Sequence, residues 1–510
     1  MDVAERINSC CQRGRQAFWR RILTAVLKVN RNRFRWLSVL VLSCASSVSI
    51  AHCLAQESVQ SAAATPKPAD APAVDTKSPG NFFERWRDFY RTDWKALPST
   101  DAAPARRGLP SPLDSPPFPS SDWSYGGSPT IGEPDSNSYP LMTAINGAKS
   151  RTKIYGWVEP TVNFSTSSHS NAPEANDIYS NRFELSQLVV YVERLPDTVQ
   201  RKHIDWGYHL TALYGADYRY TTGKGYFSSQ LLDHNRQYGF DPTLEYVDIY
   251  IPQVAQGMNI RIGRYISVPG IEAQLTPYNY MFSHSLLYVI DPFTDTGVIG
   301  TVKLSDRWLA QLGINVSHDV APWTSDARPS GTACLDYTTG SVNDNFYVCA
   351  NGINAAKYSY NNLQQYDATW YHRFTKTIHT ATEGYFMYQR DVPRVDGPIL
   401  PEKGSNAAYC RPNQLRCTAP EFALVNYTQK ELNVHNFIGF RSDFLADKKG
   451  QRTGYATKYS ENTIMLSHWI GTTVQIRPEL RFERSWDVRA YDNGTKRNQL
   501  TFASDVIFHF

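Results

Sequence analysis

Residues 499–510 read Gln-Leu-Thr-Phe-Ala-Ser-Asp-Val-Ile-Phe-His-Phe, and this stretch decides the fold. Every second position is apolar except for one serine: Leu500, Phe502, Ser504, Val506, Phe508 and Phe510. The intervening positions include the polar residues Gln499, Thr501, Asp505 and His509. A period of two predicts a strand with one apolar and one polar face. In a soluble sheet this terminal strand would be an aggregation-prone edge, whereas in a closed membrane barrel its apolar face meets lipid.

Aromatic residues end the chain at Phe508 and Phe510, as in the assembly signal of bacterial outer-membrane barrels. Outer-membrane lipid and the barrel assembly machinery are therefore expected partners. The same alternation predicts strands at 203–219 and 474–484. A lone proline, Pro478, falls on the outward face of the second strand, so either a local bulge accommodates it or the strand lies elsewhere in the sequence.

The period of two continues from about Lys153 to the C-terminus, with short and long connections in alternation. Short periplasmic turns and long external loops are typical of transmembrane barrels, and the pattern predicts about 14 strands, within a range of about 12–16. The longest segments, including 318–362, are expected to be loops. We therefore predict an all-β, transmembrane, antiparallel up-and-down barrel over residues 151–510. A Tyr-rich soluble β-protein is the alternative.

Composition agrees with a barrel. The 510 residues include 52 basic and 48 acidic ones, a net charge of +4 that argues against a nucleic-acid partner. Mean hydropathy is low, at −0.45, yet there are 31 Tyr, 23 Phe and 12 Trp. A wet lumen with aromatic girdles has this composition. After Gln56 the sequence contains no apolar run of about 18 residues, which argues against a helical membrane protein.

The first 150 residues differ in composition from the rest. Residues 1–55 contain a basic arm, an apolar run and small residues before Gln56, which predicts a signal peptide with a long n-region. Residues 56–150 are rich in Pro, Ala and Ser and predict a periplasmic or lumenal segment. Aromatic residues at helical spacing near 81–95 predict a short amphipathic helix, capped by Asn81. This helix has four possible positions: at the membrane surface, at the barrel mouth, against a partner, or docked on the barrel.

Four cysteines follow the predicted signal peptide, and all lie in sequence typical of loops: Cys334, Cys349, Cys410 and Cys417. An even number in an exported chain suggests disulfides, and three pairings are possible. The simplest joins Cys334 to Cys349 and Cys410 to Cys417, which would place both disulfides in external loops.

No catalytic or metal-binding motif is found in the sequence. It contains no G-x-S-x-G, H-E-x-x-H or phosphate-binding loop, and no Cys/His spacing typical of zinc. We therefore expect neither enzymatic activity nor a cofactor or metal. Catalytic residues that converge from distant strands would give an outer-membrane enzyme, which stays an alternative.

The best functional candidate is the stretch 264–298, which is too apolar for an exposed loop. It would either fold into the lumen and narrow it, or cap the rim or cover a neighbour. The candidate pore-lining and constriction residues come from this stretch and from charged residues at strand positions expected to face inward. They are Arg219, Arg264, Tyr278, Tyr280, His284, Asp291, Asp295, Arg441, Arg477, Glu479, Arg481 and Glu483. Such charges would either bias ion selectivity or form cross-strand ion pairs.

Several motifs together resemble the putative OmpL-like β-barrel porin family. They include G-R-Y-I-S at 263–267, P-Y-N-Y-M-F-S-H-S at 277–285, D-P-F-T-D-T-G-V at 291–298 and R-S-D-F-L-A-D-K-K-G at 441–450. The resemblance spans about residues 112–510. It implies an outer-membrane barrel of a Gram-negative bacterium with a porin role, and it supplies no catalytic residues.

The predicted function is an outer-membrane porin for passive diffusion of small hydrophilic solutes or ions. Porin-like homo-trimers are possible by analogy. Two alternatives remain: a non-conducting barrel whose disulfide-braced external loops act in surface binding or adhesion, and the outer-membrane enzyme.

Overall fold

The computed structural model describes residues 80–95, 139–173, 176–198, 200–228, 237–341, 343–355, 357–375, 377–402, 405–433 and 435–510. The predicted signal peptide, residues 1–55, lies outside these residues, as does most of the predicted Pro-rich segment.

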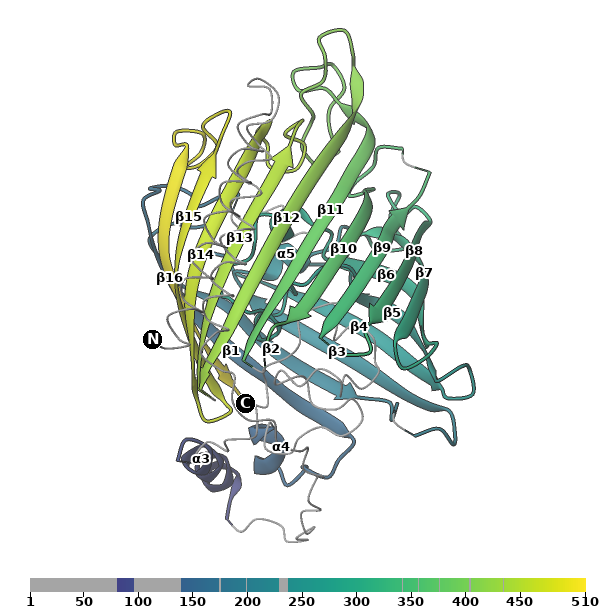
Figure 1. Cartoon of the computed structure of the whole chain (residues 1–510), viewed down its shortest axis with the longest axis vertical. Helices are drawn as coiled ribbons and strands as arrows, with labels where there is room; N and C mark the ends of the chain where they lie inside the picture. The colour runs from purple at the N-terminus through teal and green to yellow at the C-terminus, as the bar shows by residue number, and fades with distance from the viewer. Residues whose placement is uncertain are drawn as a thin grey trace, which may run out of the picture. The chain divides into compact units, whose positions relative to one another are not determined.

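Within the described residues, sixteen strands form one closed barrel, in which sequence neighbours pair and β1 closes on β16 (Figure 1). Every pair is antiparallel. The predicted fold class is thus confirmed, and sixteen is the upper end of the expected range. The strands are β1 Thr152–Ser165, β2 Phe183–Arg194, β3 Asp205–Gly215, β4 Gly239–Ile251, β5 Met258–Ile266, β6 Thr294–Lys303, β7 Trp308–His318, β8 Ser330–Thr338, β9 Asp344–Ile353, β10 Gln364–Arg373, β11 Ile378–Pro393, β12 Arg416–Asn433, β13 Asn436–Asp447, β14 Thr457–Ile470, β15 Val474–Ser485 and β16 Asn498–His509.

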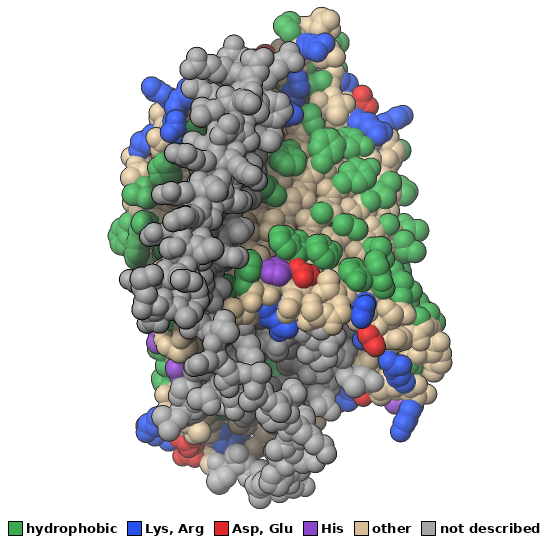
Figure 2. Space-filling view, viewed as in Figure 1, with side chains coloured by type: hydrophobic (Ala, Val, Ile, Leu, Met, Phe, Trp, Pro, Cys, Tyr) green, Lys and Arg blue, Asp and Glu red, His purple; other side chains and the backbone are tan. Residues whose placement is uncertain are grey.

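The alternation of side chains along the strands explains why the sheet closes on itself. On β16, Leu500 and Phe502 are 41% and 45% exposed, whereas Gln499 and Thr501 are fully buried. Apolar side chains therefore point outward and polar ones point inward, the reverse of a soluble barrel. On the face seen in Figure 2, hydrophobic side chains gather over the strands, and most charged side chains lie toward the two ends.

Strands β8 and β9 were not expected, because the segment 318–362 was predicted to be a loop. On the outward face of β8 the residues begin with Gly331 and Ala333, which weakens the apolar signal of a lipid-facing strand. Polar residues and Cys334 on the other face complete a composition typical of loops. The expected strand count was low because this hairpin was missed.

The predicted strand 203–219 ends earlier than expected. Strand β3 stops at Gly215, whose φ of +152° favours glycine, and a short helix, α5 (Tyr218–Thr221), follows. Arg219 therefore lies on α5 and not on a strand. Pro478 causes no bulge, because β15 keeps the same register with β14 on both sides of it.

The disulfide partners are those of the simplest pairing, but one location was wrong. Cys334 and Cys349 are bonded, and they face each other in register across β8 and β9, buried on the inner side. This disulfide therefore lies in the barrel wall and not in an external loop. The Cys410–Cys417 disulfide joins the connection 394–415 to the start of β12.

Among the described residues, two helices precede β1 at the end of the barrel that carries the short turns 252–257, 304–307 and 471–473, called here the short-turn end (Figure 1). They are α3 (Phe82–Asp93) and α4 (Pro140–Ala144). Helix α4 buries Tyr139 and Met142 beside the inward-facing Tyr155 and Trp157. Across the residues for which the structure is described, no helix is both long and apolar enough to cross a membrane.

Candidate functional site: a loop inside the barrel

The connection 267–293 between β5 and β6, called here the inner loop, lies inside the barrel. It contains two short 3-10 helices, η2 (Thr276–Tyr278) and η3 (Tyr288–Ile290). Most of its side chains are buried, among them Met281, Ser283 and Leu286, each 1% exposed. The loop thus occupies the lumen, which explains its apolar sequence.

Inward-facing side chains of strands on different sides of the barrel bind the inner loop. The Glu383 carboxylate on β11 accepts the Ile271 N–H at 2.7 Å, and the Asp443 carboxylate on β13 accepts the Leu286 N–H at 2.9 Å. On β15 the Glu479 carboxylate accepts the Ser283 N–H at 3.1 Å. Buried backbone groups outside regular structure need such partners, and the strand carboxylates supply them.

Further hydrogen bonds extend this attachment past β16 to β1 and β2. The Thr276 hydroxyl donates to the Glu159 carboxylate on β1 at 2.9 Å, and the Gln187 amide on β2 donates to the Gln274 carbonyl at 2.9 Å. The inner loop is therefore bound along the arc of the wall that runs from β11 through β16 to β2.

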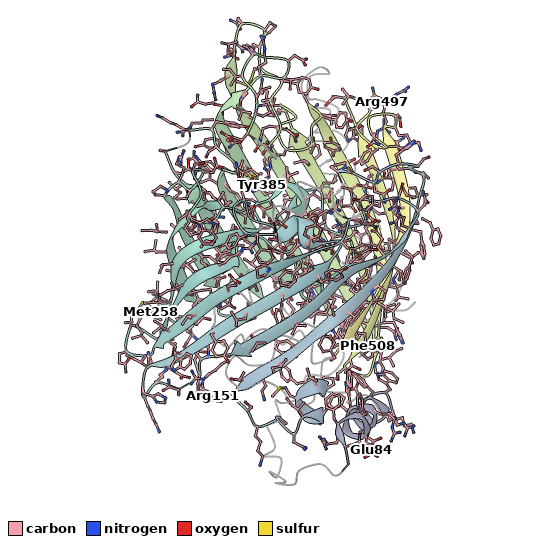
Figure 3. All side chains as sticks on the ribbon, turned by 180° about the vertical axis from the view of Figure 1, so that it is seen from behind. Glu84, Arg151, Met258, Tyr385, Arg497 and Phe508 are labelled. Atoms are coloured by element: carbon pink, nitrogen blue, oxygen red, sulfur yellow. A yellow bond between two sulfur atoms is a disulfide. The ribbon has the colours of Figure 1, made fainter. Side chains whose placement is uncertain are left out.

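Apolar packing completes the attachment. The apolar residues of the inner loop pack against tyrosines of β10 to β14 in one buried cluster that includes Ile271, Leu286, Leu287, Tyr371, Tyr385, Tyr427 and Tyr459. The Tyr385 hydroxyl donates to the Leu287 carbonyl at 3.0 Å (Tyr385 is labelled in Figure 3). Because both the polar and the apolar groups of the inner loop are buried against the wall, the loop has one defined position.

Buried arginines on β13 and β15 also bind the loop, beside the carboxylates of the same strands. Arg441 pairs with Glu461 at 2.9 Å and donates to the Ser283 hydroxyl at 2.8 Å. Arg477 pairs with Asp505 and donates to the Asn279 carbonyl at 2.9 Å.

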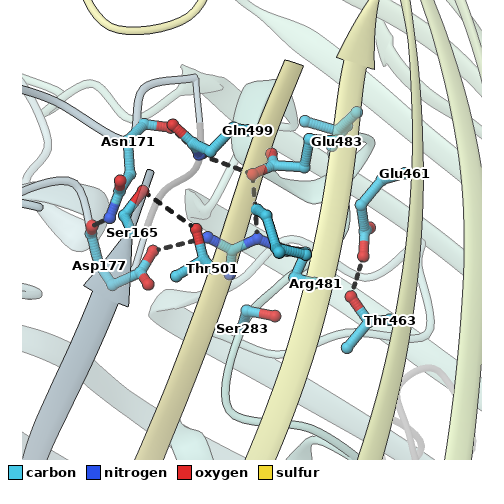
Figure 4. A network of polar contacts seen from close by, with 12 residues as sticks. Ser165, Asn171, Asp177, Ser283, Glu461, Thr463, Arg481, Glu483, Gln499 and Thr501 are labelled. Carbon is cyan, nitrogen blue, oxygen red and sulfur yellow. Dashed lines mark hydrogen bonds and ion pairs between the residues drawn. The ribbon is translucent and has the colours of Figure 1, made fainter. Parts of the chain in front are cut away.

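Arg481 belongs to the polar network drawn in Figure 4. Its guanidinium lies 3.0 Å from the Asp177 carboxylate and 3.1 Å from that of Glu483, and the Gln499 amide donates to Glu483 at 2.7 Å. The pair with Asp177 joins β15 to the connection 166–182, and the Gln499 hydrogen bond joins β16 to β15, so these polar groups stabilise the wall as well as line it.

Negative charge predominates among the buried groups. In the described part of the chain, buried Asp and Glu side chains far outnumber buried Lys and Arg side chains. The buried bases are Lys153, Arg264, Arg441, Arg477 and Arg481. A lumen with an excess of carboxylates favours cations over anions.

A narrow cavity remains beside the inner loop. It measures about 40 Å3, and it lies between Pro277–Tyr280 and the inner faces of β11 to β15. Its lining includes His379, Gln429, Phe437 and Trp469, residues near the short-turn end. The Tyr280 hydroxyl lies 2.9 Å from His379 Nε2 at its edge.

The candidate constriction residues divide into two groups. Those on β13, β15 and the inner loop come together, namely Tyr280, His284, Arg441, Arg477, Glu479, Arg481 and Glu483. Asp291 lies near the end of the inner loop, and its carboxylate accepts a hydrogen bond from the Gln365 amide on β10 at 2.5 Å. The side chain of Tyr278 lies outside the described residues.

The other three candidates lie elsewhere in the wall. Arg264 on β5 is buried and pairs with Asp241 at 3.1 Å, and Asp295 on β6 pairs with His318 at 2.7 Å. Arg219 on α5 donates to the Tyr179 hydroxyl at 3.0 Å.

Sequence reasoning missed the residues that hold the inner loop, chiefly Glu159, Gln187 and Gln365 on β1, β2 and β10. Parity places all three inward, but nothing in the sequence tells which inward residue meets a loop from the far side. Nothing in the sequence around His379 indicates that this residue lies beside the cavity.

Burial shifts the pKa of loop groups inside the barrel. It lowers the pKa of His284 to about 3, so the imidazole is neutral at physiological pH, and its Nε2 lies 2.9 Å from the Ala273 carbonyl. It raises the pKa of Asp291 well above its ordinary value, with the neighbouring Glu383 as the second cause. Among the described residues no group of three His, Cys, Asp or Glu side chains is arranged to hold a metal ion.

Solved porin structures are similar to the barrel. The anion-selective porin from Comamonas acidovorans gives a TM-score of 0.45 with 10% identity, covering 70% of this chain and 99% of that one. The outer-membrane channel DcaP of Acinetobacter baumannii gives 0.43 with 10% identity, covering 70% and 97%. OmpT of Vibrio cholerae, in its trimer form, gives 0.42 with 8% identity, covering 70% and 99%.

Curated proteins give no significant sequence match. A family model does match, that of the putative β-barrel porin-2, OmpL-like family, and it matches residues 151–510. This range covers the whole closed barrel, the inner loop and the terminal strand. The chain therefore belongs to the putative OmpL-like β-barrel porin-2 family.

Proposed function

We propose that this protein is an outer-membrane pore through which small hydrophilic solutes or ions diffuse, and that the inner loop sets the width of the path. The observation that carries the proposal is the inner loop itself, which is bound to β1, β11, β13 and β15 inside a closed barrel. A loop that is bound to the inner wall narrows the pore inside the barrel, whatever position the loops at the rim adopt.

The outer surface of the barrel supports a location in the outer membrane. Outward side chains are apolar and inward ones polar along the strands, as in other barrels that span the outer membrane. The predicted signal peptide would export the chain, and the short turns would face the periplasm.

A second candidate function follows from the extent of burial. The inner loop and its apolar cluster lie in the lumen, and the cavity beside the loop is about 40 Å3. A barrel closed in this way would not conduct, and its long connections would then act in surface binding or adhesion.

Single-channel recording of the refolded mature chain in a planar bilayer separates the two candidates. A heat-dependent shift in gel mobility first establishes that the barrel is folded. We expect small, steady, ohmic conductance steps, because a narrow, fixed constriction passes ions without gating. A folded barrel that gives no steps would contradict the porin proposal and favour the adhesive function or the enzyme.

A further inference from the structure

Helix α3 has a locally specified start and two different sides. The Asn81 side chain accepts the Glu84 N–H at 3.0 Å, and the Glu84 carboxylate accepts the Asn81 N–H at 2.9 Å, which is a capping box. Helical spacing places six aromatic residues on one side: Phe82, Phe83, Trp86, Phe89, Tyr90 and Trp94. Most of the remaining surface carries charged residues, and Asp93 lies on the aromatic side.

The C-terminal half of α3 is bound to the short-turn end of the barrel. The Tyr90 hydroxyl donates to the His509 carbonyl at 2.9 Å, and the Trp94 indole donates to the Thr473 hydroxyl at 3.0 Å. The Asp93 carboxylate accepts the Thr472 N–H at 3.0 Å. Gly471 permits this approach, since a Cβ there would lie 2.2 Å from Asp93 Oδ2.

This attachment brings the aromatic side of α3 to the edge of the outward-facing wall. The Tyr90 ring centroid lies 5.0 Å from that of Phe508, a residue of the outward face of β16. Figure 3 shows Phe508 and Glu84 of α3 at the same end of the barrel. Exposed outward tryptophans lie near the short turns of other strands, namely Trp206, Trp308 and Trp370. Such aromatics mark the membrane–water interface of transmembrane barrels.

The N-terminal half of the aromatic side extends beyond the barrel. Phe83 is 73% exposed, although it lies two turns before the buried Tyr90 on the same side of the helix. Arg87 and Arg91 flank this side, and both side chains are more than half exposed. Their ion-pair partner is Asp88, at 3.5 and 4.0 Å, on the same helix. Exposed aromatics bordered by arginines are typical of helices that lie in a membrane interface.

We propose that α3 lies in the headgroup layer of the leaflet at the short-turn end, with Phe82, Phe83 and Trp86 toward the acyl chains. Arg87 and Arg91 then contact the phosphates of phospholipids. A lipid surface is the partner that fits, because the aromatic side continues the lipid-facing wall at Phe508 and the flanking charges are cationic. This binding surface is independent of conduction through the lumen.

Photo-crosslinking of the full-length chain in nanodiscs tests the proposal. Nanodiscs of phosphatidylethanolamine and phosphatidylglycerol receive three variants in turn, in which p-benzoylphenylalanine replaces Phe83, Asp88 or Leu312. Asp88 lies on the charged side of α3, and Leu312, 70% exposed on the outward face of β7, is the positive control. The heat-dependent gel shift shows that each variant is folded.

We expect a phospholipid adduct at positions 83 and 312 and none at 88, by mass spectrometry. Arg87→Gln with Arg91→Gln should lower the share of phosphatidylglycerol in the adduct at position 83. Three results would overturn the proposal: an adduct at 312 without one at 83, equal lipid adducts at 83 and 88, or adducts at 83 with protein alone.

Discussion

At the scale of single residues, Tyr280 of the inner loop contacts the barrel wall at β11. Its hydroxyl contacts His379, and its ring borders the cavity of about 40 Å3. Tyr280→Ala removes the ring and should raise single-channel conductance, because the cavity then widens toward β11 and β12. The measurement is the conductance of the variant in a planar bilayer, compared with that of the natural chain.

Tyr280→Phe is the matched control for this prediction. It keeps the ring and loses only the hydroxyl, so its conductance should stay near that of the natural chain. If both variants conduct like the natural chain, the solute path does not pass Tyr280.

Asp217, which precedes α5, predicts a pH effect on stability. Burial raises the pKa of Asp217 from an ordinary value of 3.8 to about 8, although Gln187 donates to its carboxylate at 3.0 Å. The folded state therefore binds a proton that the unfolded state has lost. The free energy of unfolding should fall as pH rises from about 4 to about 8.

Asp217→Asn should make this decline shallower, because an amide cannot ionise and still accepts the hydrogen bonds. Denaturant unfolding followed by tryptophan fluorescence at several pH values measures the difference. Parallel pH curves for the two proteins would show that Asp217 is ionised in the folded state.

For single residues, the sequence predicted which side chains face the lumen, but it did not predict which residues those side chains contact. Parity placed Arg441, Arg477 and Glu479 inward, and all three are buried. It failed for Arg219, because the chain leaves β3 at Gly215. Contacts across the lumen, such as Glu159 with Thr276, depend on barrel closure and leave no local pattern.

At the scale of elements, the two disulfides have different surroundings and should differ in effect. Cys410–Cys417 joins residues seven apart, at the end of the connection 394–415 and the start of β12, where few strand hydrogen bonds hold the chain. Its loop-closure contribution is about 2–3 kcal/mol. Cys410→Ser with Cys417→Ser should therefore speed amide hydrogen exchange in residues 394–415.

The pair Cys334 and Cys349 is the matched comparison. These residues already face each other in a hydrogen-bonded hairpin, between the pairs Ala333–Ala350 and Leu335–Val348. Replacing both with serine should change exchange in β8 and β9 much less. The opposite order of effects would show that the hairpin depends on its disulfide.

Elements with strong alternation were predictable, and those with small residues were not. Strands β15 and β16 follow from sequence because large apolar residues alternate with charges. The hairpin of β8 and β9 was missed because the outward face of β8 begins with the small residues Gly331 and Ala333. A lipid-facing strand tolerates small residues, since lipid can fill the space beside them.

At the scale of the whole molecule, the buried charge predicts ion selectivity. The described part of the chain buries many more carboxylates than bases, even though the full 510-residue sequence carries a net charge of +4. In a salt gradient, the reversal potential should have the sign of a cation-preferring pore. Its magnitude should decrease at low pH as carboxylates are protonated. A reversal potential of the opposite sign would show that Arg441, Arg477 and Arg481 govern the path.

The position of the inner loop also constrains the order of events during assembly. The loop contacts Glu159 on β1 and Glu479 on β15, which flank the seam where β1 meets β16. A sheet that had already closed would need to admit the loop, with its polar backbone, through the long-loop rim. Entry before closure is the simpler route, and the loop then presents β1 and β15 with a shared surface. The inner loop would thus act as an internal template on which β1, β15 and β16 assemble as the barrel closes.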